Sequence, residues 1–483
     1  MTVRRWTRLT MIFFFAALTL VGPASGQQEN KSLPSAEQVD EYIENGMTEL
    51  NTPGAAVALI KNGKITHLKG FGRIEETGAP VTPQTPFQIA SMTKSFTSLV
   101  VLQLANEGLL SIDDPVVKYI PYFRTSDSHI SDTITIRQLM NHRSGISTLD
   151  GNRYQRTTYR GKDALEQAVG MLSRAHLETL PGKRFHYSNA NYAVLADLIE
   201  VVDKTTFEKA LEARVFSRIG MINTYVQVPT RPVEPEAKGN LQWFGIPIES
   251  HFIAGRMMMG AGGVTTSAED LAKYMIAISR NDPRIVPPAL SDSWTRARRI
   301  GYEFGWEHDE YDGQPVIFHN GENPGFRSIM MYAPKSGRGA LFLTNMSGTL
   351  QGNLPVGAVR YSLGLPATSI SPSELFAGLL WGSLALLAAL AAGCVFSISR
   401  LRKNVLKPWK RSSQMRFTIM VLPNIFLLAF AFIMLFYVPR SFGVDFSAAS
   451  LFNPDLGVLL LALATIAVVW AIARSVLLYR RTS

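Results

Sequence analysis

Ser91 and Lys94 are the residues of this sequence whose types and spacing most directly suggest chemistry. They open the stretch Phe87–Ala105, in which apolar residues recur near helical spacing after a turn-rich run. Side chains three residues apart lie on one face of a helix, so the lysine amine can reach the serine hydroxyl. A serine hydroxyl is a poor nucleophile until a base takes its proton, and Lys94 supplies a base and a positive field. The structural alternative is that Ser91 is an N-cap and Lys94 is solvated on the first turn.

Two later segments offer side chains that could complete a site around Ser91. Tyr187 and Asn189 place a phenol and a carboxamide two residues apart, and on a tight loop both can face one cleft. A tyrosine whose pKa is lowered by a nearby ammonium can act as a general base or acid. His319 and Gly321 fall where a late edge strand is expected, and glycine there would let a substrate backbone approach closely. The structural alternatives are a core tyrosine, a turn asparagine and a histidine that caps a strand end.

The elements that must position these residues are strands at both ends of a long segment, with helices between them. A hairpin is predicted around Asn62-Gly63, after an amphipathic helix at 36–50 that Pro53-Gly54 ends. Towards the end of this segment, short β-rich runs separated by turn residues lie at 316–319, 328–333 and 339–344. This arrangement predicts an α+β domain whose sheet joins both ends of the segment. The Pro- and Gly-rich stretch 229–249 predicts a long loop.

Apolar runs at the two ends of the sequence predict export and membrane insertion. Residues 1–26 have the basic start, apolar centre and small final residues of a signal peptide. An uncleaved anchor is the alternative, and either would export the following domain. After a short linker at 366–374, the region 375–483 contains three runs, 375–397, 417–438 and 456–478, each long enough to cross a bilayer.

The distribution of charge indicates the orientation of these spans. The formal net charge is +10, but the segment 399–416 alone holds seven Lys or Arg and no acid. Such a loop stays in the cytoplasm, so the sequence predicts a multi-pass membrane protein with a cytoplasmic loop 399–416 and C-terminus. Residues 27–374 are then extracytoplasmic. Because the basic excess lies at the ends and in this loop, we expect a lipid bilayer as a partner and no nucleic acid.

Cysteine and metal-ligand patterns argue against several other classes of protein. Cys394 is the one cysteine, and it lies inside an apolar run, so an intrachain disulfide is excluded and a thiol nucleophile is disfavoured. The sequence has no H-E-x-x-H zinc motif and no G-x-S-x-G nucleophile elbow.

At its candidate site residues the sequence resembles the serine β-lactamase and penicillin-binding protein superfamily, whose pattern is S-x-x-K, S-D-N and K-T-G. Ser91-Met-Thr-Lys94 matches the first part, and Tyr187-Ser-Asn189 is similar to the class C branch, which includes DD-peptidases, D-aminopeptidases and esterases. The segments 139–146, 261–263 and 319–325 are also similar to that branch. The resemblance covers roughly residues 35–365. It implies that domain 27–365 has an antiparallel sheet flanked by helices plus a helical subdomain.

The third motif departs from the class C β-lactamases, which carry Lys where this sequence has His319. A His-x-Gly motif looks more like the DD-peptidase and D-aminopeptidase relatives. The family lysine helps to bind the carboxylate of a β-lactam, and histidine is only partly charged near neutral pH. The resemblance therefore leaves efficient β-lactam hydrolysis in doubt.

The mechanism that the resemblance implies is acyl transfer through a covalent acyl-enzyme on Ser91. Lys94 and Tyr187 would share its proton, and the sequence does not decide which of them is the base. Backbone N–H groups of Ser91 and Glu322 would bind the oxyanion. Asn189 would orient the substrate amide. His319, in the motif that ends at Gly321, would bind the carboxylate end of the substrate. This chemistry needs no metal and no organic cofactor.

These inferences predict a membrane-anchored serine hydrolase with an extracytoplasmic catalytic domain. D-amino-acid peptides of the cell wall are the expected substrates, and related small amides or esters are possible within the same chemistry. An esterase or D-aminopeptidase is the alternative on the same fold, because fold does not fix substrate. A non-hydrolytic sensor or scaffold that binds β-lactams or cell-wall fragments is the alternative from another class of protein. The oligomeric state is not predicted.

Overall fold

A computed structural model of the chain describes residues 33–74, 77–227, 235–287, 300–366, 368, 370–372, 374–404 and 413–482. The described residues up to Ser371 form one compact unit and those from Pro372 onward form another, so each unit is described by itself. The predicted signal peptide at 1–26 lies outside the described residues, and so does the centre of the predicted loop 399–416.

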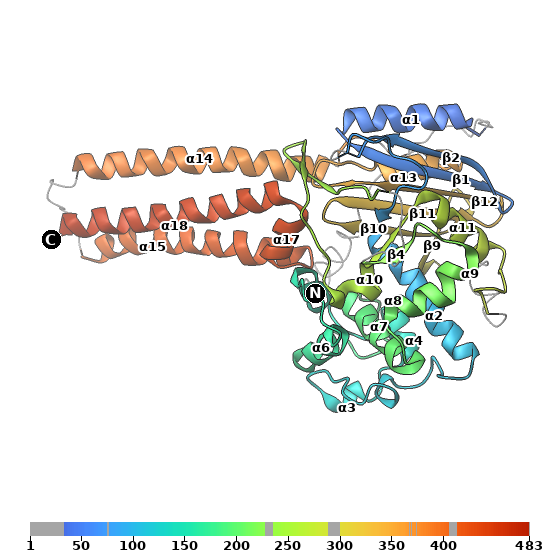
Figure 1. The fold of residues 1–483 in the computed structure, drawn as a ribbon. Helices are drawn as coiled ribbons and strands as arrows, with labels where there is room; N and C mark the ends of the chain where they lie inside the picture. Colours follow the sequence, from blue (N-terminus) through green and yellow to red (C-terminus); the bar gives the residue numbers. More distant parts are fainter. Residues whose placement is uncertain are drawn as a thin grey trace. The chain divides into compact units, whose positions relative to one another are not determined.

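The first unit is built on a seven-stranded antiparallel sheet with the strand order β2-β1-β12-β11-β10-β9-β8 (Figure 1). Its strands are β1 (Gly54–Lys61), β2 (Lys64–Gly72), β8 (Gly301–Glu303), β9 (Trp306–Tyr311), β10 (Gln314–Asn323), β11 (Phe326–Ala333) and β12 (Arg338–Thr344). β1 pairs with both β2 and β12, so the sheet joins early and late segments as predicted. Asn62 and Gly63 have φ angles of 50° and 69°, which suit the tight turn of the predicted hairpin.

The α+β class, with its antiparallel sheet flanked by helices, is confirmed. Helices α1 (Ala36–Glu49) and α13 (Leu354–Ser362) pack together, and α13 contacts β11 and β12. In Figure 1, the helices α2 (Thr93–Asn106) and α11 (Ala268–Ser279) lie on the other side of the sheet. Ser35 caps α1 in a capping box with Gln38.

A group of helices, most of them short, forms the predicted helical subdomain beside the sheet. They are α3 (Ser128–Ser131), α4 (Ile136–Met140), α5 (Thr148–Asn152), α6 (Ala164–Met171), α7 (Asn189–Asp203), α8 (Phe207–Leu211), α9 (Ser217–Ile219) and α10 (Met259–Gly262). A second small sheet joins β3 (Phe87–Gln88), β7 (Val264–Thr266) and β4 (Tyr225–Val226).

The prediction of a loop over 229–249 is wrong for its second half. β5 (Asn240–Trp243) and β6 (Ile246–Glu249) form a hairpin there, and β13 (Met346–Ser347) pairs with β5. Phe244 and Gly245 turn the chain with φ angles of 51° and 86°. The turn was not recognised because only its second residue is a glycine.

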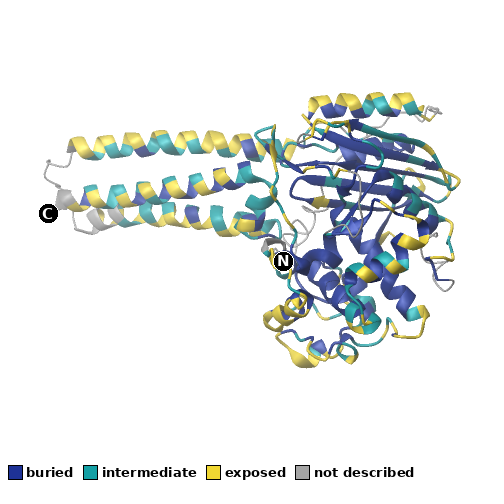
Figure 2. Ribbon diagram, viewed as in Figure 1, coloured by how far each residue is buried: buried dark blue, intermediate teal, exposed yellow. Residues whose placement is uncertain are grey.

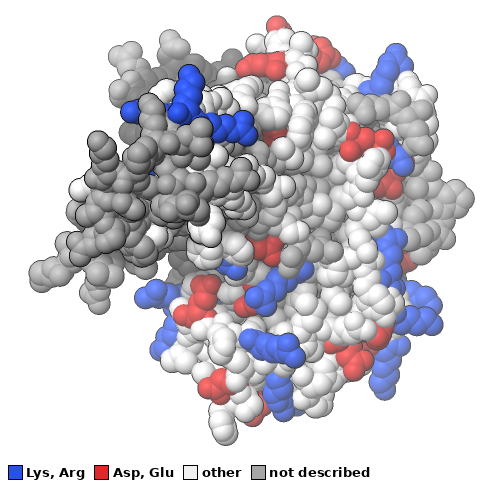
Figure 3. Space-filling model, turned by 90° about the vertical axis from the view of Figure 1, so that its left-hand side faces the viewer, with Lys and Arg blue, Asp and Glu red and all other residues white. Residues whose placement is uncertain are grey.

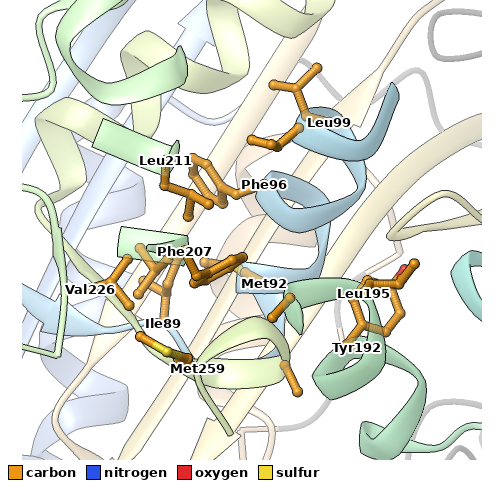
Figure 4. Close-up of a cluster of buried hydrophobic side chains, with 14 of the residues drawn as sticks. Ile89, Met92, Phe96, Leu99, Tyr192, Leu195, Phe207, Leu211, Val226 and Met259 are labelled. Atoms are coloured by element: carbon orange, nitrogen blue, oxygen red, sulfur yellow. The ribbon is translucent and has the colours of Figure 1, made fainter. Parts of the chain in front are cut away.

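Helix α2 lies at the centre of the hydrophobic core, and every residue from Thr93 to Leu104 is buried (Figure 2). Phe96 of α2 stacks on Tyr274 of α11 with ring centroids 3.9 Å apart, and Phe216 meets it edge-on. Figure 4 shows other apolar side chains packed around Phe96, among which Ile89 and Met92 come from the turn that leads into α2. A helix surrounded in this way holds its first residues in a fixed position.

The second unit contains three helices that are long and apolar enough to cross a membrane. They are α14 (Glu374–Asn404), α15 (Ser413–Phe432) with its continuation to Ser441, and α18 (Pro454–Thr482). The three predicted spans lie within these helices. α18 contacts both α14 and α15, and it is the most buried of the three.

We predict that Phe96→Ala destabilises the first unit by about 3–5 kcal/mol, because it removes a fully buried ring and leaves a cavity. Urea unfolding of residues 27–371 measures this change. The matched control is Leu109→Ala, which removes a half-exposed side chain and should cost about 0.5 kcal/mol or less. Equal effects of the two substitutions would contradict the central place given to α2.

Candidate active site

Ser91 lies on a strained turn just before α2. Ala90, which precedes it, has a φ of 46°, a left-handed conformation that residues with a side chain rarely adopt. Neighbouring strands hold this turn, because the N–H of Ile89 donates to Val264 O (3.0 Å) and the Ser328 hydroxyl donates to Ile89 O (2.9 Å). The N-cap of α2 is Met92, without a side-chain hydrogen bond, so Ser91 does not cap the helix.

The hydroxyl of Ser91 is the meeting point of two side chains from different elements. Lys94 Nζ, one turn along the chain, lies 3.0 Å from Ser91 Oγ. The Tyr187 hydroxyl donates to Ser91 Oγ over 2.9 Å from a residue 96 positions away. The three residues that the sequence predicts as catalytic are therefore brought together, while their catalytic roles stay predictions.

Lys94 is fully buried, and its amine has polar but uncharged surroundings. Nζ donates to Ala261 O over 2.8 Å and lies 4.9 Å from the ring centroid of Tyr187 and 5.5 Å from that of Tyr192. It forms no ion pair with a carboxylate of the described residues. Burial therefore lowers the pKa of Lys94 well below its usual value. The favoured form is the neutral amine, whose lone pair can accept the serine proton.

Tyr187 differs from the expectation that a nearby ammonium lowers its pKa. Burial raises the pKa of Tyr187 well above its usual value. A neutral Lys94 would supply no positive charge to favour the phenolate. The phenol is therefore neutral and positioned as a proton donor. This difference favours Lys94 over Tyr187 as the group that first takes the serine proton.

His319 also differs from its expected charge. Burial lowers the pKa of His319 to about 3, so the imidazole is neutral near pH 7. Its Nδ1 lies 2.6 Å from Asn320 O and donates to that carbonyl, so Nε2 accepts from the Tyr302 hydroxyl at 3.2 Å. His319 can therefore polarise or orient a substrate only as a neutral group. Tyr302 was missed, because nothing near it in the sequence marks it.

The sequence predicted that His319 lies on an edge strand, but the strand that carries it is an inner one. β10 lies between β9 and β11, but its pairing with β9 ends at Phe318, so His319 and the residues after it pair with β11 alone. Gly321 faces the Ser91 turn: a Cβ there would lie 2.1 Å from Ile89 O. Glycine is thus required by the close approach of two parts of the chain.

Glu322 follows Gly321 on the same strand, opposite Arg327 of β11. Its exposed side chain lies 3.7 Å from the Arg327 guanidinium, so the side chain is directed to a surface ion pair. Its backbone N–H remains the predicted oxyanion donor.

Asn189 is held by a residue that the sequence did not single out. Its Nδ2 donates to Asn152 Oδ1 of α5 over 3.0 Å. The Oδ1 of Asn189 is buried and has no hydrogen-bond partner. The free atom is an acceptor, so in this orientation Asn189 could orient a substrate amide through its N–H.

His142 supports the loop that carries Tyr187. Its Nδ1 accepts from the Ser188 N–H at 3.1 Å and lies 3.0 Å from Asn191 Nδ2, and its ring centroid is 4.3 Å from that of Tyr187. Burial lowers the pKa of His142 well below its usual value, so this ring is neutral too. The site is therefore assembled from uncharged aromatic and amide groups.

Two other features of the described residues are the spacing of their metal-ligating side chains and the distribution of their surface charges. Among the described residues, no three His, Cys, Asp or Glu side chains are grouped closely enough to hold a metal ion. On the face drawn in Figure 3, the described basic and acidic side chains of the lower half are interspersed.

Comparison with known proteins gives a family and a set of similar structures. The family model described as Beta-lactamase matches residues 39–356. Protein flp of Staphylococcus aureus strain N315 is 29% identical over 323 residues, which cover 65% of this chain and 64% of that protein. The match thus spans less than two thirds of the relative's length.

Two solved structures are similar to the first unit in fold. An octameric penicillin-binding protein homologue from Pyrococcus abyssi has a TM-score of 0.61 and 26% identity, covering 68% of this chain and 77% of its own. A D-stereospecific amidohydrolase from Streptomyces sp. has a TM-score of 0.55 and 23% identity, covering 65% of this chain and 95% of its own. At such identity the second likeness concerns the fold alone.

We predict that Gly321→Ala slows acylation of Ser91 by about 10²-fold. The added Cβ would lie 2.1 Å from Ile89 O, so β10 and the Ser91 turn must move apart, which misplaces the serine hydroxyl. The rate of adduct formation with a reactive acyl donor measures this loss. Gly170→Ala in α6 is the matched control, since its Cβ would meet nothing within 4 Å. Normal acylation in Gly321→Ala would contradict the tight contact.

Proposed function

Because the chain belongs to the Beta-lactamase family, we propose that its first unit is a serine hydrolase that acts through an acyl-enzyme on Ser91. The observation that carries this proposal is the convergence of a buried lysine amine and a neutral phenol on one serine hydroxyl, at 3.0 and 2.9 Å. Alternative structural roles explain this less well, because Ser91 caps no helix and Lys94 is not solvated.

In the first step, the Ser91 proton passes to Lys94 Nζ while Oγ attacks a substrate carbonyl carbon. The carbonyl π electrons move to the oxygen, and the backbone N–H groups of Ser91 and Glu322 stabilise the resulting oxyanion. The lysine, which is neutral before the step, becomes an ammonium beside the tyrosine rings that can stabilise it.

In the second step, the oxyanion collapses and the leaving group departs with a proton. The Tyr187 hydroxyl is a neutral donor close to Ser91 Oγ, and it can be reprotonated by the Lys94 ammonium. Water then attacks the ester carbon and gives its proton to the neutral Lys94 amine or through Tyr187. The acyl–Oγ bond breaks, the proton returns to Ser91 Oγ, and the carboxylic acid departs. The proposed roles of Asn189 and His319 are to orient the substrate through an acceptor and a neutral imidazole.

We assign the substrate class to small amides or esters, with D-amino-acid peptides of the cell wall as the first candidates. Support comes from the D-stereospecific amidohydrolase whose fold is similar and from the family match. A neutral His319 supplies no positive charge for a β-lactam carboxylate, which disfavours rapid β-lactam turnover.

The proposed location is the membrane, with the first unit outside the cytoplasm. Three helices of sufficient length and apolarity support membrane anchoring. The cationic segment 399–416 and the leader-like residues 1–26 support the orientation.

We predict that the full-length protein forms a mass adduct with a penicillin, or turns over a D-Ala-D-Ala peptide or nitrophenyl ester, and that Ser91→Ala lowers either reaction by at least about 10³-fold. The matched control is Ser95→Ala, which removes a buried serine of the same helix whose hydroxyl donates to Met92 O. A stable adduct without turnover of any of these compounds would favour the sensor. Full activity of Ser91→Ala would refute the proposal.

A second prediction concerns pH. The acylation rate should rise with pH through the pKa of Lys94, because only the unprotonated amine accepts the serine proton, and that limb should lie well below the usual lysine range. His319→Gln should slow acylation by about tenfold, because it removes the imidazole that orients the substrate. The midpoint of the pH profile should not move, because the pKa of His319, about 3, lies below the measured pH range. Stopped-flow rates between pH 5 and pH 9 measure both effects. Loss of the pH dependence in His319→Gln would show that His319 is the titrating group.

A further inference from the structure

The membrane helices of the second unit enclose an apolar groove. It has a volume of about 610 Å³, within the range of small-molecule pockets, which is about 300–1,000 Å³. Leu390 of α14 lies on one side, the segment of α15 that includes Pro423 and Phe426 lies on the other, and Trp470 and Arg474 of α18 lie between them. α18 packs against both neighbours, so it forms the floor of the groove.

Arg474 is the charged residue of this groove. Its Nη2 donates to Ile419 O of α15 over 2.6 Å. Pro423, four residues after Ile419, has no N–H, so that carbonyl lacks its helical partner and is available to the arginine. The Nε of Arg474 is buried without a hydrogen-bond partner, and within the described residues the guanidinium forms no ion pair.

Two further polar groups near the groove are incompletely bonded. The indole N–H of Trp470 is buried without a partner, and Asn424 uses its Nδ2 to donate to Ser475 Oγ (2.8 Å) while its Oδ1 stays unpaired. The ring of Trp470 lies close to α14, since a Cβ on Gly393 would be 3.1 Å from it. An arginine and an indole N–H thus lie in a groove whose other lining residues are apolar.

The end of the bundle nearest Arg474 is strongly cationic. Arg474 precedes Arg480 by six residues, about 9 Å along the helix. The last turn of α14 carries Arg402 and Lys403. The sequences 399–416 and 456–483 contain no Asp or Glu, so a second copy of this chain in the same orientation would bring only more cations to this end.

We propose that this groove binds an anionic glycerophospholipid, with an acyl chain between α14 and α15 and its phosphate at Arg474. A guanidinium in an apolar layer needs an anion or several acceptors, and phosphate oxygens match its donors. Burying a hydrocarbon chain in the groove adds apolar contact area. The lipid site belongs to the second unit and does not depend on the proposed catalytic activity.

The test uses the delipidated full-length protein in detergent, titrated with phosphatidylglycerol or with phosphatidylcholine of the same acyl chains. Native mass spectrometry counts bound lipids. Arg474→Gln removes the charge, and its matched control is Arg440→Gln, which changes an exposed arginine that also donates to a backbone carbonyl. Ala429→Trp fills the groove, and Leu428→Trp is its control on an exposed position that does not line the groove.

The expected result is one tightly bound phosphatidylglycerol on the wild type and on both controls, with affinity reduced about tenfold in Arg474→Gln and Ala429→Trp. Phosphatidylcholine should bind the wild type no better than phosphatidylglycerol binds Arg474→Gln. Equal binding of the two lipids would refute the proposal, because it would describe ordinary annular lipid. Dimerisation that displaces phosphatidylglycerol would also refute it, because the groove would then be an interface between copies.

Discussion

The structure of the candidate site depends on the complete burial of the Lys94 amine. Burying an ammonium without a counter-ion is costly, so the group gives up its proton instead. Its position is fixed by α2, which is buried on all sides, and by the carbonyl of Ala261 that accepts one amine hydrogen. Burial thus favours the unprotonated amine next to Ser91, which is the form that can accept a proton.

The same environment determines the state of the surrounding side chains. Tyr187, His142 and His319 are all neutral, because burial disfavours the charged form of each. In the proposed mechanism, a positive charge appears only when Lys94 accepts the serine proton, and the rings of Tyr187 and Tyr192 already lie near its amine. The Arg474 guanidinium of the second unit is a contrasting case. It cannot lose its proton, so it must be satisfied by acceptors such as the free carbonyl of Ile419.

Much of this architecture could be predicted from local sequence signals. The Asn62-Gly63 turn, the late strands and the three apolar helices follow from turn residues and hydrophobic runs. The meeting of Ser91, Lys94 and Tyr187 was expected from motif order. The charge states were not, because the pKa values of Tyr187 and His319 depend on burial by residues far away in the sequence. The positions of Asn152 and Tyr302 depend on tertiary contacts for the same reason, and no spacing rule reveals them.

Direct titration of Lys94 tests the central claim most sharply. Residues 27–371 with ¹³C-labelled lysines would be followed by NMR, with the Lys94 signal assigned from its absence in Lys94→Met. The proposed site predicts that the ¹³Cε shift of Lys94 is that of a neutral amine at pH 7, while the exposed lysines remain protonated. A Lys94 signal that titrates with them near pH 10.5 would contradict the proposal that an unprotonated lysine activates Ser91.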